Sequence, residues 1–208
     1  MGRAPRLQVA NVVYHVNTVG AGGIGIFLDG DDRSRFLRIL AYVTEKYAWR
    51  CHLYCLMSNH YHLVVTTIEP NIAAVMHVLN GLYAQTFNKR HSRTGHLFGA
   101  RYHDEIVRTD AHGLAVCAYV PLNPWRAGLC ELPEHWPWSS YGATLGFRKS
   151  PWFLDDDWVL RQFDEFDAER ARQRYRTYVT SVMVAELATS FQPSSTLEVP
   201  GTVEVARP

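Results

Sequence analysis

The spacing of apolar residues switches repeatedly, along residues 11–122, between the two-residue period of strands and the longer period of helices. The strand pattern occupies residues 11–18, 50–57, 60–68 and 103–108. The helix pattern begins near Asp31, Asn71 and Asp110. This β-α-β-β-α-β order with one further helix predicts an α+β, ferredoxin-like (RRM-like) fold. We expect an antiparallel sheet with helices packed on one face and the other face free for a ligand or partner.

The chain is long enough for one main core and a smaller addition. Its 208 residues carry a net charge of +1 and are 47% apolar, which is ordinary for a globular protein. We expect a main domain at 1–150 and a C-terminal extension at 151–208, with helices at 155–162 and 168–187 and then a flexible polar tail. No apolar run is long enough to cross a membrane. The four cysteines form no CxxC pair, so we expect reduced thiols and a cytoplasmic protein.

Two histidines interrupt the apolar strand pattern of CLMSNHYHLVVTT, residues 55–67. His60 and His62 are two positions apart, so their imidazoles project from the same face of a strand. Two imidazoles are half of a metal site, because a divalent ion needs at least a third ligand. Most such pairs are satisfied core or surface histidines, so this pair alone decides nothing. Cys51 and Cys55, which we expect on one strand face, could hold zinc but fit ordinary buried thiols better.

The last helix pattern, VCAYVPLNPWRAG, places Tyr119 and Asn123 one turn apart on one helical face. If this face lies over the sheet beside the histidines, Asn123 supplies the missing oxygen ligand and Tyr119 supplies a nucleophile. A core tyrosine followed by an asparagine near the helix end fits the residues equally well. Pro121 lies between the two and could kink the turn, and Pro124 is expected to end the helix after about Leu122.

Taken together, these motifs resemble the REP-associated tyrosine transposases, a bacterial branch of the single-tyrosine HUH transposases. The likeness covers about residues 5–146, and several motifs occur in the order typical of that family. The segments that carry it are PRLQVANVVYHVNT, DDRSRFLRIL, NHYHLVV, GHLFGARYHDEIV, YVPLNPWRAGL and WPWSSYGA.

The resemblance implies that His60, His62 and Asn123 hold one divalent metal ion, Mg²⁺ or Mn²⁺. It also implies that Tyr119 attacks a phosphodiester of single-stranded DNA and forms a 5′-phosphotyrosine intermediate. A DNA 3′-hydroxyl then rejoins the strands without a nucleotide cofactor. The implied substrate is hairpin or repeat-associated (REP) DNA. The implied protein is a monomer or homodimer that acts at the bacterial nucleoid.

Basic and aromatic side chains that suit DNA gather mainly in residues 89–112. The candidates for DNA contacts are Arg3, Arg6, Lys89, Arg90, Arg93, Phe98, Arg101, Tyr102 and Arg126. Two rival functions remain open at this point. One is a non-catalytic nucleic-acid-binding module on the same fold, and the other is a metal-dependent hydrolase in which water replaces the tyrosine.

Overall fold

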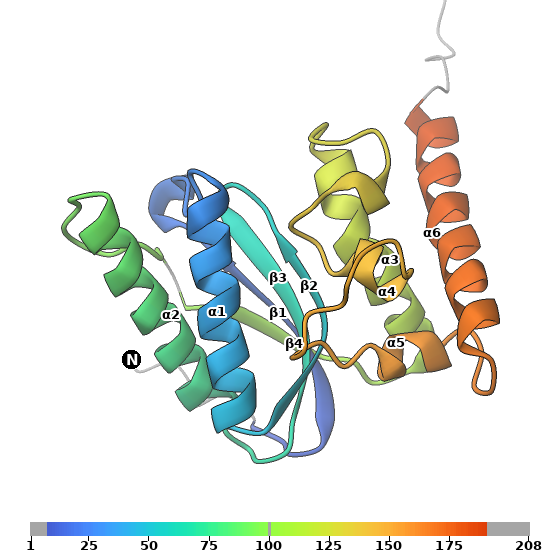
Figure 1. The fold of residues 1–208 in the computed structure, drawn as a ribbon, viewed down its shortest axis with the longest axis horizontal. Helices are drawn as coiled ribbons and strands as arrows, with labels where there is room; N and C mark the ends of the chain where they lie inside the picture. Colours follow the sequence, from blue (N-terminus) through green and yellow to red (C-terminus); the bar gives the residue numbers. More distant parts are fainter. Residues whose placement is uncertain (1–7, 100, 191–208) are drawn as a thin grey trace, which may run out of the picture.

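The computed structural model describes residues 8–99 and 101–190, and it contains one four-stranded antiparallel sheet (Figure 1). The strands are β1 (Val12–Val19), β2 (Trp49–Leu56), β3 (His60–Thr67) and β4 (His103–Ile106), in the order β2-β3-β1-β4. Helix α1 (Gly30–Lys46) joins β1 to β2, and α2 (Ile72–Arg90) joins β3 to β4. This is the ferredoxin-like arrangement, so the predicted fold class is confirmed.

The first core lies between the sheet and the pair α1 and α2, which cover the same face (Figure 1). Alternate strand residues supply it, because successive side chains of a strand point to opposite faces. Tyr14 of β1 and Leu63 of β3 are fully buried there against Phe36 and Leu40 of α1. The apolar stripes that predicted both helices therefore face this core.

The second face of the sheet is partly covered, which corrects the expectation of a free face. Helix α3 (Asp110–Arg126) packs over β2 and β3. Helix α5 (Asp157–Arg161) also contacts β2, and α6 (Ala168–Ser190) packs against both α3 and α5 (Figure 1). Leu53 and Val64 of the sheet share a second core with Val116 and Val120 of α3. The sequence pattern missed this cover because the strand segments alone do not show where the later helices pack.

The C-terminal region contains the two predicted helices, α5 and α6, and a shorter helix, α4 (Tyr141–Thr144). Single 3-10 turns occur at Ala21–Gly23 and Pro133–His135. The backbone N–H of Asp155 donates to the carbonyl of Cys51 at 2.8 Å, so this region is hydrogen-bonded to the sheet edge. The boundary at residue 150 stays a prediction, and the tail at 191–208 lies outside the described residues. Throughout the described part of the chain, every helix is too short or too polar to cross a membrane.

A β-bulge interrupts β2 between Cys51 and Leu53. The extra residue reverses which way the following side chains point. Cys51 therefore packs into the first core and Cys55 into the second. The expectation that the two thiols share a strand face is wrong, so they do not form a pair of zinc ligands.

Candidate active site

The candidate active site lies on the face of the sheet that α3 partly covers. His60 and His62 both point to this face from β3, and their ring centres are 5.1 Å apart. The neighbouring strand, β1, contributes a third imidazole from His15. The Nε2 atom of His15 lies 3.1 Å from Nδ1 of His62, which is hydrogen-bonding distance.

His15 was not among the residues predicted from the sequence. The signal was present in NVVYHVNT, because His15 alternates with the core residues Tyr14 and Val16 and must face away from them. The ferredoxin-like order places β1 beside β3. The alternation and the strand order together would have predicted that His15 lies on the same face as His62.

All three imidazoles lie where burial disfavours the charged form. Burial lowers the pKa of His62 to about 3 and that of His15 to about 4. The pKa of His60 is also lowered by burial. Each ring is therefore neutral near pH 7, and the neutral imidazole is the form that binds metal ions.

In both His60 and His62 the ring Nδ1 atom contacts a neighbouring side chain, which leaves Nε2 as the nitrogen that can bind a metal ion. Nδ1 of His62 contacts His15, and Nδ1 of His60 lies 2.8 Å from Oδ1 of Asn59. Nε2 of His62 is buried and has no hydrogen-bond partner among the described residues. A buried polar atom without a partner costs free energy. The pair therefore fits a metal ion bound through Nε2, with each Nδ1 held by a neighbour.

A metal ion bound by the two histidines would need a third ligand that is not a histidine, cysteine, aspartate or glutamate. Among the described residues, no group of three or more His, Cys, Asp or Glu could hold a metal ion. An amide oxygen or water would have to complete the set. Asn123 of α3 donates its amide nitrogen to the carbonyl of Tyr119 at 2.8 Å. Its amide oxygen is thus the atom left for a ligand role, and its place in a metal site stays a prediction.

Tyr119 projects from α3 toward the imidazoles. Its ring meets His62 edge-on, with ring centres 5.4 Å apart, and meets His15 at 5.7 Å. The Tyr119 side chain remains 42% exposed. The structure thus brings the tyrosine and the strand histidines together on one face of the sheet, as the sequence predicted on the condition that α3 lies over the sheet.

Helix α3 continues past both of its prolines, so the expected end at Pro124 is wrong. A proline lacks an N–H and leaves the carbonyl four residues earlier without its helical partner. Pro121 frees the carbonyl of Cys117, and the hydroxyl of Tyr175 in α6 donates to that oxygen at 2.8 Å. Pro124 frees the carbonyl of Val120. The substitute contact to Cys117 comes from a side chain that is distant in sequence, which a local pattern cannot reveal.

The carbonyl of Val120 is contacted from within the same helix. The amide nitrogen of Asn123, which bonds the carbonyl of Tyr119, also lies 3.4 Å from the oxygen of Val120. The side chain of Thr109, rather than that of Asp110, caps the start of α3 by accepting from the N–H of His112. Asn123 therefore supports the backbone of the helix that carries the candidate nucleophile.

One of the predicted DNA contacts, Tyr102, is corrected by burial. The Tyr102 side chain is 8% exposed and belongs to the first core. Phe98 packs against the same core, with its ring centre 6.4 Å from that of Tyr61. The Tyr102 ring is therefore not an open platform for a base, whereas Phe98 is half-buried and its contact with DNA stays a prediction. The segment that carries them folds inward because its apolar residues complete the core.

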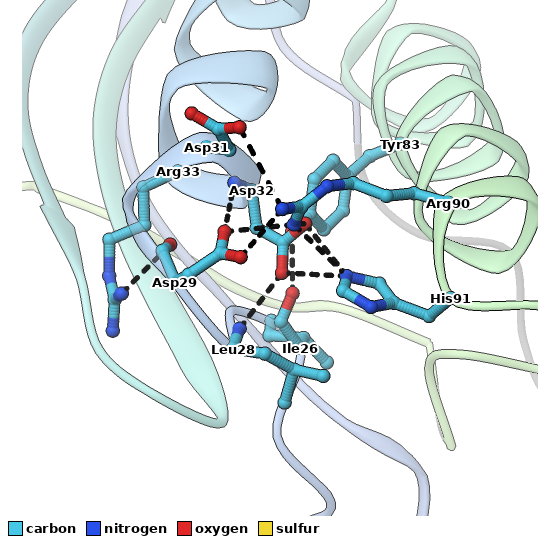
Figure 2. Close-up of polar contacts among 9 residues, drawn as sticks. All are labelled: Ile26, Leu28, Asp29, Asp31, Asp32, Arg33, Tyr83, Arg90 and His91. Atoms are coloured by element: carbon cyan, nitrogen blue, oxygen red, sulfur yellow. Dashed lines mark hydrogen bonds and ion pairs between the residues drawn. The ribbon is translucent and has the colours of Figure 1, made fainter.

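The guanidinium of Arg90 forms ion pairs with carboxylates of the same chain (Figure 2). It bonds both carboxylate oxygens of Asp29, and also contacts the carboxylate of Asp32, which is 1% exposed. His91 bonds the same Asp32 carboxylate at 2.9 Å. These contacts join the start of α1 to the end of α2, so Arg90 has a structural role that its sequence position did not reveal.

The other predicted DNA contacts differ in exposure and in the residues that they contact. Lys89 and Arg101 are exposed, and the Arg93 guanidinium lies 5.8 Å from the centre of the Phe87 ring. Arg126 bonds residues of α3 and α6. Arg3 and Arg6 lie outside the described residues.

An open groove of about 460 Å³ lies between the end of β1 and the start of β4. Arg101 and His103 line it, together with Asn17, which pairs with His62 across the sheet. Gly99 also lines this groove, and a Cβ there would come within 2.8 Å of the Ala21 backbone. Glycine therefore permits the close approach of two loops at the groove wall.

Comparisons with known proteins agree with this fold. Residues 8–122 match the family of IS200-like transposases, a span that covers more than half of the chain and includes His60, His62 and Tyr119. The chain therefore belongs to the IS200-like transposase family. No curated protein matches the sequence.

Solved structures share the fold at low sequence identity. A REP-associated tyrosine transposase bound to a REP hairpin matches with a TM-score of 0.60 and 12% identity, over 75% of this chain and 93% of that one. A Deinococcus radiodurans chain named as a transposase matches at 0.42 and 14% identity, over 62% and 98%. The tRNA(His) guanylyltransferase of Saccharomyces cerevisiae matches at 0.45 and 9% identity, over 92% and 85%. The last two likenesses are too weak to support an argument.

Proposed function

We propose that the protein cleaves and rejoins single-stranded DNA through a covalent bond between Tyr119 and a 5′-phosphate. The observation that carries this proposal is the edge contact of the exposed Tyr119 ring with His62, beside a buried ring nitrogen that lacks a partner. Family membership supports a transposase, and the solved relative bound to a REP hairpin suggests a hairpin substrate. Mg²⁺ or Mn²⁺ is the proposed cofactor.

The cleavage step exchanges one phosphate ester for another. The Tyr119 oxygen forms a bond to phosphorus, the bond from phosphorus to the 3′ oxygen breaks, and the 3′ oxygen gains the proton that the phenol loses. A divalent metal held by His60, His62 and Asn123 would polarise the phosphate. The protein itself supplies neutral imidazoles, an exposed phenol and a groove lined by Asn17 and Arg101. Rejoining reverses the exchange with a DNA 3′-hydroxyl.

The test is incubation of the protein with single-stranded hairpin DNA and Mn²⁺, followed by a search for a tyrosyl-DNA adduct by mass. We expect an adduct on the peptide that contains Tyr119, and none with Tyr119→Phe. Tyr42→Phe is a matched control, because Tyr42 is 44% exposed and lies on α1. Cleavage that persists in Tyr119→Phe would favour attack by water instead. DNA binding without cleavage in wild type, with any metal, would favour the binding module.

The proposed setting of this reaction is the bacterial cytoplasm, at the nucleoid. The protein would act there as a monomer or homodimer. Sedimentation of the protein with and without hairpin DNA would separate the two states.

A further inference from the structure

Arg126 reaches back along α3 to the candidate nucleophile. Its guanidinium carbon lies 5.2 Å from the centre of the Tyr119 ring, and its Nη1 atom donates to the Tyr119 carbonyl at 3.1 Å. The two residues are seven positions apart, or about two helical turns, so they lie on the same face of α3. A cation over the face of an aromatic ring is attracted by the electron density of that ring.

The C-terminal helix holds Arg126 in this position. Glu186 of α6 accepts from Nε of Arg126 at 2.9 Å and from Nη2 at 2.5 Å. Two parallel bonds between a guanidinium and a carboxylate fix the plane of the guanidinium as well as its distance. The hydrogen bond from Arg126 also holds the pKa of Glu186 below its usual range, so this carboxylate stays charged near pH 7.

We propose that Arg126 is a positioning residue for Tyr119 and that Glu186 of α6 holds it against the ring. The inference rests on the proposed function, in which Tyr119 becomes negatively charged as its proton leaves and again when it departs from phosphorus on rejoining. A guanidinium fixed over the ring orients the phenol toward the imidazoles and places positive charge beside it. This assigns a role in the chemistry to a helix that lies beyond the matched span of residues 8–122.

A different role, a direct phosphate contact, is what the sequence alone suggested for Arg126. The two roles predict different kinetics. A phosphate contact strengthens DNA binding, so its loss raises Kd and leaves the rate at saturating DNA unchanged. A positioning role acts on the nucleophile, so its loss lowers that rate and leaves Kd unchanged.

The experiment compares Arg126→Gln, Glu186→Gln and the charge swap R126E/E186R with wild type. Arg176→Gln is the matched control, because Arg176 also pairs with a carboxylate, that of Glu134, and also lies 5.2 Å from an aromatic ring centre, that of Phe147. The readouts are the rate of adduct formation at saturating hairpin DNA, the Kd for that DNA, and the Tm. A fourth readout, the fluorine NMR signal of Tyr119 in protein labelled with 3-fluorotyrosine, needs no DNA. Tyr119→Phe assigns that signal.

We expect Arg126→Gln to lower the rate about fivefold, as befits the loss of a partly exposed cation over a ring. We expect Kd to stay within about twofold and the Tyr119 fluorine signal to shift. Glu186→Gln should act in the same direction with a smaller effect, and Arg176→Gln should change neither the rate nor the signal. The charge swap should recover the Tm but not the rate, because it restores the α3–α6 ion pair without a cation over Tyr119.

Three results would overturn the positioning role. Recovery of the rate by the charge swap would show that the ion pair only fastens α6 to α3. A rise in Kd at unchanged rate would make Arg126 a phosphate contact. An unchanged fluorine signal in Arg126→Gln would show that the guanidinium does not hold the ring. If wild type forms no adduct, the proposed function fails, while the fluorine signal still decides whether Arg126 positions Tyr119.

Discussion

The histidines of the sheet face are uncharged because of where the fold places them. His62 is 2% exposed, and burial lowers its pKa to about 3 and that of its neighbour His15 to about 4. In the unfolded chain both imidazoles would titrate near their ordinary value of about 6.5. Between the folded and unfolded values, the unfolded chain binds more protons than the folded one. The free energy of unfolding must therefore rise with pH in that interval and fall as the solution is made acidic.

Removal of one of these imidazoles should flatten that dependence. For His15→Gln, we expect the free energy of unfolding to depend less on pH between about 4 and 6.5, by up to about 1.4 kcal/mol per pH unit. Glutamine keeps a polar group near His62 but cannot titrate. Urea unfolding of both proteins at intervals from pH 4 to 8 measures the two slopes, and the curves should run parallel above pH 7. Equal slopes below pH 6.5 would show that His15 is not held neutral by the fold.

At the scale of elements, the start of α1 is joined to the end of α2 by the buried carboxylate of Asp32 (Figure 2). This carboxylate accepts from the N–H of Leu28 at 2.9 Å as well as from Arg90 and His91. The start of this helix near Asp31 was predicted from the sequence, but the partners of its acids, which lie 58 to 61 residues later, were not. A buried carboxylate with several donors is costly to neutralise, because each donor is then left poorly paired.

Asp32→Asn should therefore lower the free energy of unfolding by about 2 to 3 kcal/mol. Asp31→Asn is its control, because the neighbouring Asp31 side chain is 75% exposed and its carboxylate lies 3.7 Å from Arg90. We expect that change to stay within about 0.5 kcal/mol. Urea unfolding at pH 7 measures both. Similar losses for the two variants would mean that the Asp32 contacts do not stabilise the α1–α2 junction.

The strands of the sheet and the helices that cover it could be predicted from the sequence because their apolar residues recur at a fixed local period. His60, His62 and Tyr119 were found in the same way, from spacing within single elements. His15 required the strand order as well as the spacing. The carbonyl of Cys117, freed by Pro121, is bonded by Tyr175 of α6, and the burial of Tyr102 depends on packing from distant elements. Those contacts join residues far apart in sequence, so no local pattern contains them. The contact from Asn123 to the carbonyl freed by Pro124 is local to the helix.

The whole molecule consists of a sheet with a separate core on each face, and the candidate nucleophile belongs to the side built by the C-terminal helices. Helix α6 contacts α3 at two points that bracket Tyr119, through Tyr175 at Cys117 and through Glu186 at Arg126. The position of Tyr119 relative to the sheet therefore depends on how α6 docks. Loosening α6 should disturb α3 and leave α1 and α2 unchanged.

Tyr175→Phe tests this dependence with the loss of one hydroxyl. The variant keeps the ring that packs 4.8 Å from Phe163 but leaves the carbonyl of Cys117 without a donor. We expect the free energy of unfolding to fall by about 1 to 2 kcal/mol, with faster amide hydrogen exchange in α3 and unchanged exchange in α1. Tyr178→Phe is the control, because Tyr178 also packs on Phe163, at 5.6 Å, while its hydroxyl makes no hydrogen bond among the described residues. If amide exchange became faster in α1 as well as in α3, the two cores would not loosen independently. If exchange in α3 did not change, α6 would not set the position of the tyrosine helix.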